Sequence, residues 1–143
     1  MKLLLDTHIW LWSTLEPQRL TRRVEKALAD PANELWVSPV SVAELIVLVR
    51  KGRLKLSPDV AIWVAKTMQD FQLIEAPLTV EVTLAISSIS FSHGDAADQF
   101  LAASAKVFDL TLVTADEHLM HLPGIRVLPN RGPTPSQSPL TSQ

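Results

Sequence analysis

The sequence predicts an α/β fold, a three-layer α/β/α sandwich with a central parallel sheet. Short β-prone apolar segments alternate with helical patterns along the chain, which is the order expected of a parallel sheet with helices on both faces. The chain is 47% hydrophobic and 20% charged, as in a globular protein of one domain. We expect residues 1–129 to form this domain. Residues 130–143, rich in Pro, Ser and Gln, should form a disordered tail.

The expected strands are short runs of apolar, β-prone residues, beginning with the leucines that follow the N-terminus. They lie at 2–5, 35–37, 72–75, 110–113 and 126–128. Each pair of successive runs is separated by at least one helical pattern, so the strands are expected to lie parallel to one another.

The expected helices fill the intervals, starting with an apolar run directly after Asp6. The later ones lie at 21–29, 40–51, 58–70, 79–87, 95–108 and 117–122. Thr21 can cap the second helix and Gly52 can end the third. Ser57 followed by Pro58 predicts a cap and a proline at the first position of the next helix.

Composition excludes several classes of protein. There is no cysteine, which excludes disulfides, thiolate metal sites and a cysteine nucleophile. The first apolar run is too short for a signal peptide, and no run approaches the roughly 18 residues of a membrane span. We therefore expect a cytoplasmic protein with no membrane association.

Charge is nearly balanced overall but clustered locally. There are 13 basic against 15 acidic residues, a net charge of −2, which by itself predicts no polyanionic partner. Two basic clusters nevertheless offer possible phosphate contacts, although a solvated face would look the same. They are Arg50, Lys51, Arg53 and Lys55, and Arg19, Arg22 and Arg23.

Two acidic residues stand where strands end. Asp6 follows the first expected strand and Asp116 follows the fourth. In an open parallel sheet, ligands bind at the carboxyl ends of the strands near the point where strand order reverses. Each Asp is also a good helix N-cap, so either residue alone is explained without a site.

Glu44 is harder to explain by local structure. Its segment, PVSVAELIVLVRKG, is apolar nearly all round, which predicts a buried helix. A buried carboxylate needs an arginine, a hydrogen-bond network or a metal. In HGDAADQFLAASAKVF, Asp95 is the natural cap, and Asp98 lies at the edge of the apolar stripe, where it also complements the helix dipole.

Together, Asp6, Glu44, Asp98 and Asp116 come from four separate elements and indicate one site. Converging carboxylates repel each other unless cations neutralise them. Mg²⁺ takes a few carboxylates, keeps several waters and leaves room for a phosphate. Such a site can activate water for displacement at phosphorus.

Four motifs carry a family resemblance: LLLDTHIWLW, SPVSVAELIVLVRKGRL, HGDAADQFLAASA and LVTADEHL. In this order and spacing they resemble the PIN-domain ribonucleases, and more narrowly the VapC-type toxins of bacterial and archaeal toxin–antitoxin pairs. The likeness spans about residues 1–128. No single motif is highly specific, but all four occur, and no acidic position departs from the pattern.

The resemblance implies a PIN-like sandwich and RNA cleavage with Mg²⁺ or Mn²⁺, leaving 5′-phosphate and 3′-hydroxyl ends. By position it assigns the acidic quartet to Asp6, Glu44, Asp98 and Asp116. It gives supporting roles to Thr7, Asp95 and Thr114, although the proline that often follows the first Asp of D-x-x-D is Ala96 here. It also implies a VapB-like antitoxin that covers the site, and a toxin homodimer.

Other interpretations remain open. A haloacid-dehalogenase-type phosphatase needs a second Asp two residues after the first, where this chain has His8. A non-catalytic PIN-like binding scaffold would be expected to have lost acids that are all present. The four histidines are expected to be structural or on the surface, with His8 and His118 close enough to support ligands. The four tryptophans are expected mainly in the core.

Overall fold

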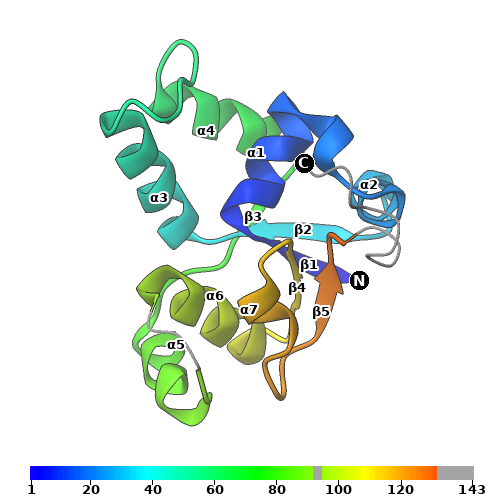
Figure 1. The fold of residues 1–143 in the computed structure, drawn as a ribbon, viewed down its shortest axis with the longest axis vertical. Helices are drawn as coiled ribbons and strands as arrows, with labels where there is room; N and C mark the ends of the chain where they lie inside the picture. The colour runs from blue at the N-terminus through cyan, green and yellow to red at the C-terminus, as the bar shows by residue number, and fades with distance from the viewer. Residues whose placement is uncertain (92–94, 132–143) are drawn as a thin grey trace.

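The computed structural model describes residues 1–91 and 95–131, which form a three-layer α/β/α sandwich (Figure 1). Its sheet has five strands in the order β3-β2-β1-β4-β5, and every pair is parallel. The strands are β1 Lys2–Leu5, β2 Glu34–Val37, β3 Ile74–Glu75, β4 Thr111–Thr114 and β5 Val127–Pro129. The predicted fold class is therefore confirmed, with strand ends shifted by at most two residues. Of the tail predicted at 130–143, residues 132–143 lie outside the described residues, whereas Asn130 is hydrogen-bonded to Arg19 and Thr21.

The sheet is the middle layer, so its central strand β1 is buried on both faces. Leu3 and Leu5 point into one apolar cluster and Leu4 into another, as the alternation of side chains along a strand requires. All three leucines are almost fully buried. A parallel sheet covered by helices on both sides needs such an uninterrupted apolar strand.

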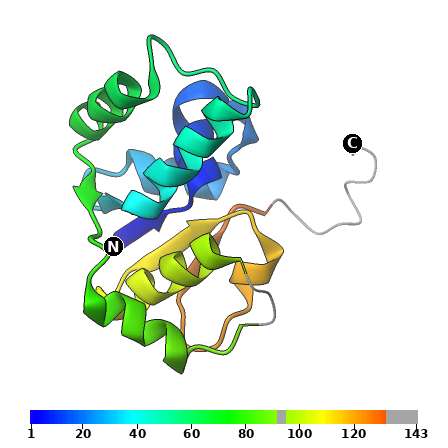
Figure 2. The same cartoon turned by 90° about the vertical axis from the view of Figure 1, so that its left-hand side faces the viewer.

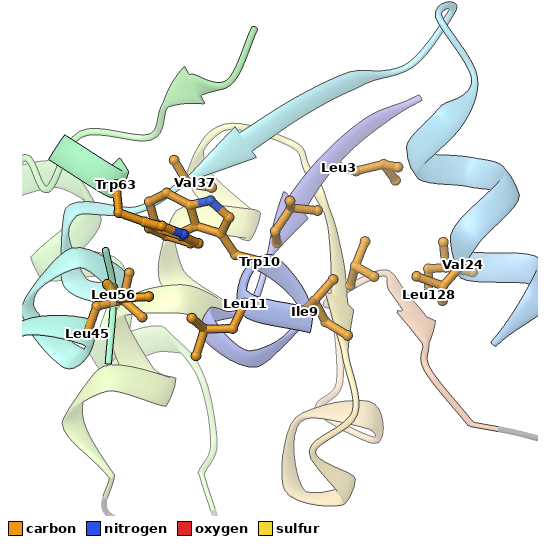
Figure 3. Close-up of a cluster of buried hydrophobic side chains, with 12 residues drawn as sticks. Leu3, Ile9, Trp10, Leu11, Val24, Val37, Leu45, Leu56, Trp63 and Leu128 are labelled. Carbon is orange, nitrogen blue, oxygen red and sulfur yellow. The ribbon is translucent and has the colours of Figure 1, made fainter. Parts of the chain in front are cut away.

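The first helical layer covers the face of the sheet that Leu3 and Leu5 share with Val113 (Figures 1 and 2). Figure 3 shows its core, where the rings of Trp10 and Trp63 lie 5.5 Å apart between centroids. Trp10 also donates from Nε1 to Thr67 Oγ1 at 3.1 Å. This layer consists of α1 Thr7–Leu15, the 3₁₀ turn η1 Pro17–Arg19, α2 Arg22–Ala29, α3 Pro39–Arg50 and α4 Val60–Asp70.

The second layer covers the face of Leu4 and Leu112. Its main helix is strongly buried because small residues let it lie close to the sheet, and every residue from 101 to 105 is buried. The layer consists of α5 Val80–Ala85, the 3₁₀ turn η2 Ile86–Ser88, α6 Ala96–Val107 and α7 Glu117–Met120. None of the helices in the described ranges is long and apolar enough to cross a membrane.

Two predicted helix ends are confirmed. Thr21 caps α2, accepting from Val24 N at 3.2 Å. Gly52 follows α3 with φ +70°, a conformation that favours glycine, and its N–H returns to Val49 O at 3.1 Å.

Two other helix predictions are wrong. The helix α4 begins at Val60 with Asp59 as its cap, accepting from Ile62 N at 2.9 Å, so Pro58 lies before the helix. The helix α3 is not buried on all sides. Only Ser41 and Leu45 are fully buried, and Val47 is 43% exposed because α3 lies at the edge of its layer.

The topology determines where a ligand can bind. The chain runs from β1 outward through β2 to β3, then returns to the other side of β1 for β4 and β5. The switch point therefore lies between β1 and β4, and the crevice opens beyond their carboxyl ends.

Candidate active site

An open cleft of about 450 Å³ lies at this switch point. It collects all four predicted ligands and the accessory Asp95, which come from four separate places in the chain because Asp95 and Asp98 both lie at the start of α6. The lining residues are Asp6, His8, Trp12, Arg19, Glu44, Asp95, Asp98, Ala115 and Asp116.

Asp6 is fixed at the base of the cleft. It is 8% exposed and directly follows β1, where its backbone N–H still pairs with Val113 O at 3.0 Å. Oδ1 accepts from Thr7 N at 2.6 Å as the N-cap of α1, and Oδ2 accepts from the hydroxyl of Thr114 at 2.6 Å. Burial raises the pKa of Asp6, and these two hydrogen bonds offset part of that rise.

Glu44 reaches the cleft from the middle of α3. Its carboxylate accepts from the hydroxyl of Thr7, which also lies 2.8 Å from Ser41 Oγ. Half-burial raises the pKa of Glu44, the Thr7 contact lowers it, and the negative charges of Asp6 and Asp95 raise it again. Of the partners expected for Glu44, the structure therefore shows a hydrogen-bond network of hydroxyl groups, and not an arginine.

Asp95 and Asp116 are both caps and members of the cleft. Asp95 Oδ1 accepts from Asp98 N at 3.2 Å at the start of α6. Asp116 Oδ1 accepts from His118 N at 2.8 Å at the start of α7, and its own N–H donates to Thr114 Oγ1 at 3.0 Å. The capping role and the site role therefore coexist in the same side chains.

The pKa of Asp98 is raised by the other carboxylates of the cleft together. Half-burial, followed by the charges of Asp95, Asp116, Asp6 and Glu44 in that order, raises its pKa to about 7. Each of these four carboxylates is close enough to act on Asp98, so the cleft concentrates negative charge in one place. Such a shift, in a cleft and with defined charge partners, is typical of functional sites.

No lysine or arginine of the described residues forms an ion pair with the cleft carboxylates. Every ion pair there involves other acids: Glu16, Asp70, Asp109 and Glu117. A set of oxygen donors with excess negative charge suits a hard divalent cation. No three acidic or histidine side chains of residues 1–91 and 95–131 already form a compact ligand cluster. The carboxylates would therefore have to move inward or bind through water.

One part of the cleft was not expected from the sequence. Trp12 was expected in the core, but it lines the cleft and is only partly buried, whereas Trp10 and Trp63 are core residues as expected. The guanidinium carbon of Arg19 lies 4.3 Å from the centroid of the Trp12 ring. The ring of His8, an exposed residue, lies 5.7 Å from the Trp12 ring.

The two predicted basic clusters lie differently. Arg19 belongs to the cleft, but the described residues Arg22 and Arg23 do not line it. The remaining cluster lies at the far end of α3 and in the segment after it, exposed and away from the lining residues. It consists of Arg50, Lys51, Arg53 and Lys55, whose role in binding RNA stays a prediction.

Known proteins similar to this chain have the fold and the family that the cleft suggests. The family model of the PIN domain matches residues 3–125. The chain belongs to the PIN domain family. Ribonuclease VapC22 from Mycobacterium tuberculosis is 33% identical to this PIN domain over 116 residues, which cover 81% of the chain and 88% of the relative.

Solved structures share the fold. One is VapBC2 from Rickettsia felis bound to a DNA fragment from its promoter, with a TM-score of 0.69, 18% identity and coverage of 90% of this chain and 98% of the matched one. Another is VapBC-5 from Mycobacterium tuberculosis, described as a member of the VapBC family of toxin–antitoxin systems. It has a TM-score of 0.56, 16% identity and the same two coverages.

Proposed function

We propose that this PIN domain protein is a metal-dependent endoribonuclease and the toxin of a toxin–antitoxin pair. The observation that carries the proposal is the convergence of four carboxylates in one cleft, where no lysine or arginine of the described residues forms an ion pair with them: Asp6, Glu44, Asp98 and Asp116. The relationship to a VapC ribonuclease gives the substrate class.

In this proposal the four carboxylates hold Mg²⁺ or Mn²⁺. Thr114 keeps Asp6 oriented at the end of β1, and Thr7 does the same for Glu44 on α3. When bound, the cation supplies the positive charge that activates a water and polarises the phosphoryl oxygens. Attack of the water on phosphorus breaks the bond to the 3′-oxygen, which takes up a proton. The products carry 5′-phosphate and 3′-hydroxyl ends.

The partner we propose is a VapB-like antitoxin that blocks this cleft, and the toxin itself is proposed to be a cytoplasmic homodimer. The likeness to chains of VapBC assemblies supports a protein partner. So does the apolar surface on the helices, where Val80 is 75% and Leu84 66% exposed. A haloacid-dehalogenase-type phosphatase is disfavoured because His8 takes the place of its second Asp.

The test is cleavage of total cellular RNA by protein freed of any co-purified partner. Discrete fragments are expected with Mg²⁺ or Mn²⁺ and none with EDTA. Asp98→Asn should abolish cleavage, because it removes one ligand charge at nearly constant shape. Asp30→Asn is the matched control, since Asp30 lies in the exposed turn before β2, at the opposite end of the sheet, and Asn can still accept from Ala32 N.

Equal cleavage by the parent and Asp98→Asn would show that a contaminant is responsible. Absence of cleavage in folded parent protein with either metal would favour a PIN-like scaffold that binds without catalysis.

A further inference from the structure

A cleft lined by five carboxylates should repel an RNA substrate, which is also negatively charged. RNA carries one negative charge per nucleotide, and a divalent ion offsets only part of the repulsion from Asp6, Glu44, Asp95, Asp98 and Asp116. Positively charged side chains normally position the phosphates that do not react.

We propose that Arg19 binds an RNA phosphate next to the one that is cleaved, and that Trp12 and Asn130 hold Arg19 in place for this. This inference rests on the proposed function, because it presumes an RNA substrate in the acidic cleft. Arg19 is the one Arg or Lys side chain among the described residues that line the cleft.

Arg19 is held away from the carboxylates. Its guanidinium lies over the ring of Trp12, at 4.3 Å from guanidinium carbon to ring centroid, which is within the range of a cation–π contact. Its ion pair is with Glu16, at 3.8 Å between two half-exposed side chains, a type of contact that contributes little. Stacking on Trp12 occupies the face of the guanidinium and leaves its N–H groups, which lie in its plane, able to donate to a phosphate.

The backbone that carries Arg19 is tied to the catalytic end of the sheet. Asn130 Nδ2 donates to Arg19 O at 3.1 Å, and Asn130 Oδ1 accepts from Thr21 N at 2.7 Å. The backbone N–H of Asn130 in turn donates to Thr114 O at 2.7 Å. Because the hydroxyl of Thr114 also holds Asp6, Arg19 and the first ligand share one rigid support.

This arrangement also explains why Arg19 differs from its neighbours in sequence. The turn η1 brings the chain back towards Trp12 after α1, whereas Arg22 and Arg23 begin the next helix and lie outside the cleft. Arg23 lines a different hollow, with Met1 and Leu128. Arg23→Gln therefore removes the same charge at a place that the proposal leaves unused.

The first experiment measures binding of a short fluorescein-labelled single-stranded RNA by anisotropy, with Ca²⁺ replacing Mg²⁺ to slow cleavage. Arg19→Gln should weaken binding on the order of tenfold, as expected for one charge-assisted contact. It should also reduce the slope of log affinity against log salt by about 0.7, the value for one phosphate on a single strand. Arg19→Lys should fall between, because it keeps the charge but loses the planar group. Arg23→Gln should bind like the parent.

The second experiment tests the positioning role of Asn130 through a double-mutant cycle with Arg19. Asn130→Ala should raise KM in the Mg²⁺ cleavage assay with a smaller change in kcat. Adding it to Arg19→Gln should have no further effect on KM, because the residue that it positions is already gone. A purely structural Asn130 would instead lower thermal stability and act equally in both backgrounds.

The outcomes separate this inference from the proposed function. If the parent cleaves RNA but Arg19→Gln keeps its affinity and salt slope, the role of Arg19 is refuted and the nuclease stands. If Arg19→Gln loses only the binding of a protein partner, Arg19 belongs to that interface and the inference is overturned. If the parent neither binds nor cleaves RNA, both are wrong.

Discussion

Asp98→Asn should stabilise the metal-free protein at neutral pH. The folded-state pKa of Asp98 is raised from 3.8 to about 7, so ionisation opposes folding. A rise of that size corresponds to roughly 4 kcal/mol if fully expressed. Because Asp98 is only half-buried, solvent screening reduces this to about 1–2 kcal/mol. The lost attraction between the carboxylate and the start of α6 takes away about 0.5 kcal/mol. A net gain of about 1 kcal/mol remains, or a rise of about 4 °C in Tm.

The pH dependence follows from the direction of the shift. Between pH 4 and 7 the folded parent binds more protons than the unfolded chain, so its stability falls as pH rises through this window. Asn does not titrate. The advantage of Asp98→Asn should therefore be absent below about pH 4 and complete above about pH 7.

The assay is urea unfolding in EDTA at several pH values, repeated with Mg²⁺. Bound Mg²⁺ favours the ionised carboxylate, so it should stabilise the parent and cancel or reverse the advantage of the variant. The control is Asp30→Asn, which should differ little from the parent in either condition. A pH-independent gain for Asp98→Asn, or a loss in EDTA at pH 8, would refute the claim that crowded negative charge destabilises this cleft.

Two further predictions concern the support of the site and its core. Thr114→Val should destabilise the protein by about 2 kcal/mol in urea unfolding and lower RNA cleavage, because buried Asp6 loses a hydrogen-bond donor. Thr114→Ser keeps the hydroxyl, so its stability and cleavage should match those of the parent. A Thr114→Val protein as stable as the parent would contradict this. Leu101→Ala, at a fully buried position on α6, should cost about 2–5 kcal/mol. The same change at Leu84, 66% exposed, should stay within about 0.5 kcal/mol in the same assay, and equal losses would mean that burial does not set the cost.

The fold could be predicted because its signals are local. Leucine runs, proline, glycine and capping residues each act within a few positions, and the alternation of strands and helices then limits the topology. The convergence of the acids followed from topology, because Asp6 and Asp116 end adjacent parallel strands. The start of α4 was misplaced because Ser57 and Asp59 are both good caps, and sequence alone does not rank them.

Other features depend on neighbours that local patterns do not reveal. An apolar helix such as α3 looks the same whether its layer is complete or ends beside it, so the exposure of Val47 was not foreseen. The pairing of Trp12 with Arg19 depends on η1, a three-residue turn whose direction is set partly by Asn130 from the other end of the chain. A distant asparagine leaves no periodic signal. The assignment of catalytic and supporting roles to the cleft residues stays a prediction.

Three of the cleft carboxylates begin helices: Asp6 begins α1, Asp95 begins α6 and Asp116 begins α7. The same carboxylate oxygens therefore cap helices and face the cleft. A mutational scan scored only on protein abundance should find these positions tolerant of Asn and Ser, which can still cap a helix, and intolerant of Leu or Val. A scan scored on toxicity should reject all four replacements. The difference between the two maps would separate what a carboxylate contributes as a charge from what it contributes as a hydrogen-bond acceptor.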